Sequence, residues 1–75
     1  MKLDDFVKLF AAQFDDTAED LFTPDTEFKQ LGEWSSLVAL SIISMVDDEF
    51  DKQLTGADLR SVKTIKQLFD LVEKK

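Results

Sequence analysis

The stretch "SSLVALSIISMVDDEF", residues 35–50, contains the most hydrophobic run of the chain and ends in a cluster of acids. Its apolar residues recur at helical spacing, which predicts an α-helix from about Ser36 to Phe50. Serine suits the start of a helix, because its hydroxyl accepts a hydrogen bond from an unpaired backbone N–H. The stripe expected to face the core consists of Ala39, Ile42, Ile43, Val46 and Phe50.

Helical spacing also predicts helices on both sides of this stretch. The first runs from about residue 2 to 14, and a short one lies near 57–61. Thr64 is the expected N-cap of the last helix, whose Lys-rich end suits the negative pole of the helix dipole. The residues expected to face the core are Leu3, Phe6, Val7, Phe10 and Phe14 in the first helix, Leu54, Leu59 and Val62 around the short one, and Ile65, Leu68, Phe69 and Val72 in the last.

Residues 15–35 show no periodicity and contain the only Pro and one of the two Gly residues, so they are predicted to form a long loop. Structureless loops of this length are uncommon in compact domains, so we expect apolar side chains to hold it against the helices. The expected anchors are Leu21, Phe22, Phe28, Leu31 and Trp34. The predicted fold is an all-α four-helix bundle with a long first loop and a short third helix, in a single domain over 1–75.

The composition limits the possible functions. The 75-residue chain is 44% hydrophobic with seven Phe, so it should fold despite a net charge of -7. It has no Cys and no His, which removes disulfides, thiolate nucleophiles and the commonest metal ligand, and we expect neither a catalytic residue nor a metal site. Its sixteen acidic and nine basic residues argue against nucleic acid and favour partners with a basic patch. With no recognisable signal peptide or membrane span, we expect a cytoplasmic monomer.

The side of the 36–50 helix opposite the predicted inward stripe is also partly apolar. A rotation of 100° per residue is expected to place Leu37, Val38, Ser41, Met45 and Asp48 there, pointing away from the core. Together with the acidic cluster that follows, these residues form a candidate docking patch for partner proteins. The alternative is that they contact the loop or the short helix, or are simply exposed, since isolated surface hydrophobic residues are common.

Two other acidic patterns are better explained without a specific site. Asp47, Glu49 and Asp51 imitate the start of a calcium-binding loop, but Lys52 stands where that loop requires Gly. Paired acids such as Asp4 and Asp5 are expected on an exposed helix face, where solvation accounts for them and acid–base catalysis is not needed.

The chain resembles an acyl carrier protein over essentially its whole length. The resemblance rests on Phe28, on Leu31 and Gly32, on Ser36 and Leu37 opening a helix that ends in "DDEFD", and on Thr64 and Ile65 at the start of the last helix. The sequence departs from the family pattern at Ser35, where an acid is usual, and it has one extra residue between Gly32 and Ser36, accounted for by the "EW" pair. Val38 and Ser41 also stand where acids are frequent.

The resemblance implies that Ser36 receives 4'-phosphopantetheine from coenzyme A and that Ser35 is a cap or loop residue. A phosphodiester at Ser36 would meet unpaired N–H groups and the positive end of the helix dipole. The implied function is to carry acyl groups as thioesters in fatty-acid or polyketide-like synthesis. Its partners would be a phosphopantetheinyl transferase, acyl transferases and ketosynthases with basic patches. The alternatives are an aminoacyl or peptidyl carrier, or an unmodified helical interaction module, in which both serines serve only as caps.

Overall fold

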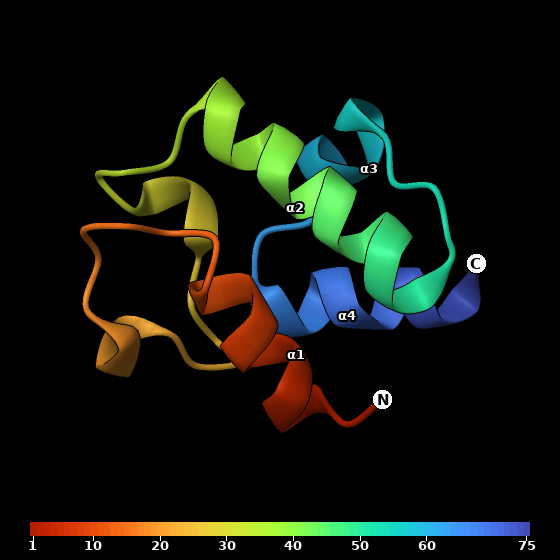
Figure 1. Ribbon diagram of the computed structural model, residues 1–75, viewed down its shortest axis with the longest axis horizontal. Helices are drawn as coiled ribbons and strands as arrows, with labels where there is room; N and C mark the ends of the chain where they lie inside the picture. Colours follow the sequence, from red (N-terminus) through yellow and green to blue (C-terminus); the bar gives the residue numbers. More distant parts are fainter.

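The computed structural model describes all 75 residues and contains four α-helices and no strand. The α-helices are α1 (Leu3–Ala11), α2 (Ser36–Phe50), α3 (Gly56–Ser61) and α4 (Ile65–Lys74), and the loop before α2 includes two single-turn 3₁₀ helices, η1 (Glu19–Leu21) and η2 (Phe28–Gln30). Figure 1 shows the loop, drawn in orange to yellow, at one end of the molecule. The predicted all-α fold with a long first loop and a short third helix is confirmed.

The ends of the helices follow local capping chemistry. The hydroxyls of Thr55 and Thr64 accept hydrogen bonds from the backbone N–H groups of Asp58 and Gln67. The side-chain oxygens of Asp58 and Gln67 in turn accept hydrogen bonds from the backbone N–H groups of the two caps. The first helix is shorter than predicted and ends at Ala11, because the chain tightens into i to i+3 hydrogen bonds at residues 13 and 14. This turn still directs Phe14 into the core.

Aromatic side chains bind the long loop to the helices. Phe28 from the loop lies with its ring centroid 5.2 Å from that of Phe10 in α1, and Phe22 lies 4.9 Å from Phe14. Phe22 and Phe28 are buried as predicted, whereas Leu21 is 56% exposed, so its predicted anchoring role is wrong. The two neighbours Leu21 and Phe22 project in different directions at the end of η1, and only Phe22 reaches the core.

The end of the loop is also hydrogen-bonded to the start of α4. The N–H of Ile65 donates to the carbonyl of Thr26 at 3.2 Å, and that of Lys66 donates to the carbonyl of Pro24 at 2.9 Å. An isolated bridge joins Glu27 to Thr64 beside them. These bonds therefore hold residues 24–27 of the loop against the start of α4 before the chain enters α2.

The rotation of α2 about its axis differs from the predicted one. Ile42 and Val46 are fully buried as expected, but Met45 is only 5% exposed and lies in the core, so its predicted outward position is wrong. The outer face carries Leu37, as predicted, and also Leu40, which are 77% and 61% exposed. Because α2 is apolar around most of its circumference, its own sequence defines the buried side poorly.

None of the helices has both the length and the apolar content needed to cross a bilayer. The longest, α2, has 15 residues.

Candidate functional site

The two serines at the start of α2 have different structural roles. Ser35 is the N-cap, and its Oγ accepts a hydrogen bond of 3.3 Å from the N–H of Val38. Ser36 is the first helical residue, is exposed, and its hydroxyl makes no hydrogen bond within the protein. The capping role expected for Ser35 is therefore confirmed, and the Ser36 hydroxyl is free to react.

Unpaired backbone donors surround this free hydroxyl. The N–H groups of Ser36 and Leu37 have no acceptor in the protein, because the first helical bond of α2 runs from Ala39 to Ser35 at 2.9 Å. The positive end of the dipole of a 15-residue helix adds to their attraction for an anion. A phosphodiester on the Ser36 Oγ therefore fits this position, since it would place negative charge beside unsatisfied donors.

The segment leading to Ser36 is held by Glu33. Its carboxylate accepts hydrogen bonds from the N–H groups of Asp15 and Asp16, at 2.7 and 3.0 Å, and from the Thr17 hydroxyl at 2.7 Å. The hydrogen bond from the Thr17 hydroxyl is the main cause of a lowered pKa for Glu33, and the backbone hydrogen bonds lower it further. Desolvation raises the pKa, but by less than these bonds lower it. Glu33 therefore joins the segment before α2 to the end of the turn that follows α1.

The ring of Trp34 also holds the segment that leads to Ser36, through contacts with two Phe rings. Its ring meets that of Phe28 edge-on at 5.0 Å and lies roughly parallel to that of Phe14 at 6.4 Å. The "EW" pair thus anchors the segment before Ser36 by three hydrogen bonds to Glu33 and two ring contacts of Trp34. The role of Glu33 could not be predicted from the sequence, because one more acid in an acid-rich loop has no distinguishing pattern.

A small depression of about 180 Å³ lies beside Ser36, between α2 and α3. It contains two basic side chains and no carboxylate. The ammonium of Lys29 donates to the carbonyls of Leu59 and Arg60 at 3.2 and 3.3 Å, which holds it at the end of α3. The lining residues are Lys29, Trp34, Ser35, Ser36, Ala39, Gly56, Leu59 and Arg60.

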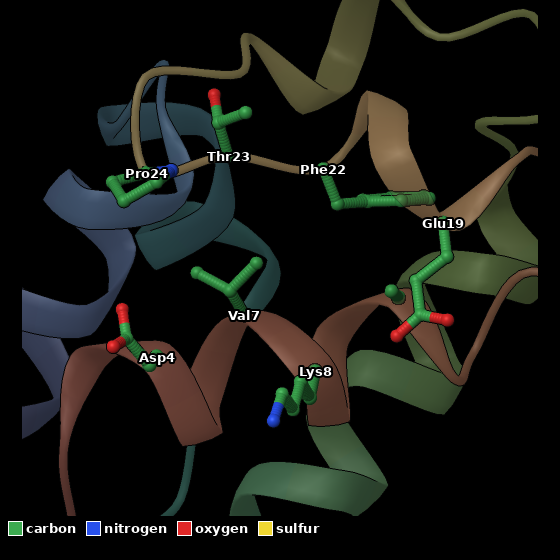
Figure 2. A pocket seen from close by; sticks show the side chains of 8 residues that line it. Asp4, Val7, Lys8, Glu19, Phe22, Thr23 and Pro24 are labelled. Carbon is green, nitrogen blue, oxygen red and sulfur yellow. The ribbon is translucent and has the colours of Figure 1, made fainter.

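Another depression, of about 350 Å³, lies between α1 and the long loop (Figure 2). Ser36 is not among the residues that line it. Its charged side chains come from both segments and have mixed signs, and it holds no serine. It therefore adds nothing to the chemistry at the start of α2. The residues that line it are Asp4, Val7, Lys8, Ala11, Glu19, Phe22, Thr23 and Pro24.

The predicted docking residues do not share one face. Leu37 and Asp48 are exposed, Val38 and Ser41 are half-buried, and Met45 is in the core. The Ser41 hydroxyl donates back to the carbonyl of Leu37 at 3.3 Å. Leu40, which was not among the predicted docking residues, is exposed and lies on the same face as Leu37, three residues earlier.

Residues 4–72 match a protein family described as "Phosphopantetheine attachment site". No curated protein and no solved structure matches the chain significantly. Members of this family are carriers without catalytic activity, and their covalently attached cofactor is 4'-phosphopantetheine. Because the match spans nearly the whole chain, this protein belongs to the family of phosphopantetheine-bearing carrier proteins and is not an enzyme.

Proposed function

We propose that Ser36 is the residue that carries 4'-phosphopantetheine, and that residues 1–75 form a single carrier domain. The observation that supports this most is the exposed, unbonded Ser36 hydroxyl at the first position of α2, next to unpaired N–H groups. Ser35 is the competing hydroxyl, but its oxygen already caps the helix. When attached, the group supplies a terminal thiol that holds acyl cargo as a thioester.

The attachment requires little from this chain beyond an accessible oxygen. The Ser36 Oγ would form a bond to the phosphorus of the pantetheine phosphate in coenzyme A, and the pyrophosphate bond would break to release adenosine 3',5'-bisphosphate. The serine proton must leave to a base. Because the chain has no His or Cys and no charged side chain bonds to Ser36, the modifying transferase supplies that base.

The cargo in this proposal is an acyl intermediate of cytoplasmic fatty-acid or polyketide-like synthesis. Partner enzymes, including acyl transferases and ketosynthases, would dock on the exposed face of α2. That face carries Leu37 and Leu40 near the serine and Asp47 and Asp48 near the other end. A matching partner surface has an apolar depression bordered by basic residues, so that charge accelerates encounter and apolar contact slows dissociation.

The attachment site is tested by incubating the apo protein with coenzyme A, magnesium and a broad-specificity phosphopantetheinyl transferase. Intact mass should show one added group on the wild type, on Ser35→Ala and on Ser44→Ala, which removes another exposed hydroxyl of α2. Ser36→Ala should show none. Modification that persists in Ser36→Ala, or a wild type that accepts no group, would overturn the assignment.

The cargo is tested separately on the modified protein. Competition between acyl and aminoacyl donors, with the corresponding loading enzymes, should favour the acyl thioester. Preferential loading of an amino acid would instead support the aminoacyl carrier function and leave the attachment site intact.

A further inference from the structure

The charge around Ser36 is unusual for this chain. Acidic residues outnumber basic ones by sixteen to nine, yet the depression beside Ser36 contains Lys29 and Arg60 and no acid. The acids of α2, which are Asp47, Asp48 and Glu49, lie at the opposite end of the helix from Ser36 and this basic depression. The local field at the depression favours an anion, in contrast to the field of the whole molecule.

Arg60 is available to bind a ligand. Its guanidinium takes part in neither of the two salt bridges, which join Lys66 to Asp70 and Lys75 to Asp58. It lies back along α3, with Nη1 3.5 Å from the position that a Cβ on Gly56 would occupy. It also makes no hydrogen bond within the protein, so all its donors remain free for an external partner.

Lys29 adds a second positive charge that is already positioned. Its ammonium has three N–H donors. The carbonyls of Leu59 and Arg60 occupy two of them, which leaves one for a ligand in the depression. These bonds restrict the Lys29 side chain before any ligand arrives, so less conformational entropy is lost on binding.

We propose that Arg60, assisted by Lys29, forms a cationic subsite that binds the phosphodiester attached to Ser36; this rests on the proposed attachment site. Ser36 lines the same depression, so the phosphate would be covalently held at its edge. The planar guanidinium matches two phosphate oxygens, and its hydrogen bonds to them are charge-assisted. The base of the arm is then held on the α3 side of Ser36, which leaves Leu37 and Leu40 uncovered for partners.

The chain offers a direct probe because Arg60 is its only arginine. In ¹⁵N-labelled protein it gives a single side-chain Nε–Hε resonance. This resonance should shift when the wild type is converted from the apo to the holo form, and should stay unchanged when Ser36→Ala is treated in the same way. Intact mass measured on the same samples reports whether the group was attached.

A complementary measurement observes the phosphate. The ³¹P resonance of the holo protein should shift in Arg60→Gln and stay unchanged in Lys8→Gln, which removes the same charge from α1 at a different depression. A modified protein with no shift of the Arg60 resonance, or with equal ³¹P resonances in wild type and Arg60→Gln, would overturn the subsite while leaving the attachment site standing. An unmodified wild type would overturn both.

The anion could also belong to the cargo. Acetyl- and malonyl-loaded forms separate the two sources, because only malonyl adds a carboxylate. If the phosphodiester is the ligand, the holo and acetyl forms should already show the full shift of the Arg60 resonance. A shift that occurs only in the malonyl form would assign the subsite to a cargo carboxylate and overturn the proposal.

Discussion

The rotation of α2 can be tested with a matched pair of substitutions in the same helix. Met45→Ala removes a side chain that is 5% exposed in the core, and Leu40→Ala removes one that is 61% exposed. Both changes end in alanine, the best helix former, so differences in helix propensity contribute little. The comparison therefore reports mainly how deeply each side chain is buried.

The expected effects differ several-fold. Replacing a buried Met by Ala costs about 2–5 kcal/mol, from lost transfer energy and the cavity left behind. For a domain of this size a loss of about 1 kcal/mol lowers the melting temperature by roughly 4–8 °C. Met45→Ala should therefore melt at least about 8 °C below the wild type. Leu40→Ala should change stability by no more than about 0.5 kcal/mol, as is typical of surface substitutions.

Circular dichroism melts and urea titrations followed by Trp34 fluorescence would measure both variants. Either variant that remains folded should still accept phosphopantetheine, because attachment requires little beyond the exposed Ser36 oxygen, which neither substitution removes. Equal melting temperatures for the two variants, or a larger loss in Leu40→Ala, would show that α2 does not turn Met45 inward and Leu40 outward.

Three other predictions follow from caps and charges. Ser35→Ala should lose about 1 kcal/mol in thermal melts because it removes the N-cap bond, whereas Ser36→Ala should be nearly neutral; the reverse order would contradict the assigned roles. Glu33→Gln should be less stable than the wild type at pH 7. Because the pKa of Glu33 is lowered in the folded protein, its ionised carboxylate stabilises the fold and protonation removes that stabilisation. Urea titrations should therefore show the difference in unfolding free energy between the two proteins closing as the pH falls below the ordinary Glu33 pKa of 4.5. With a net charge of -7, magnesium and calcium chloride at matched ionic strength should raise the melting temperature equally, and a large rise specific to calcium would point to a calcium site instead.

Much of the fold was predictable because it depends on local interactions. The bounds of α2, the cap at Thr64 and the inward spacing of Phe6, Phe10 and Phe14 depend on residues within a few positions of each other, where periodicity and capping chemistry are readable. The position of Ser36 in the first turn of α2 also depends only on neighbouring residues, because Ser35 caps the helix there. The sequence therefore determined where an exposed serine hydroxyl meets the start of a helix.

Tertiary structure decided the features that depend on distant segments. α2 is apolar on most sides, so only packing against its neighbours could turn Met45 inward and leave Leu40 outside. Glu33 bonds to residues 16–18 positions earlier, and Lys29 reaches the carbonyl of Arg60, 31 positions later. A polar residue in a loop can meet many partners, and its sequence neighbours do not specify which one. Only the packing of the whole chain brings these groups within hydrogen-bonding distance.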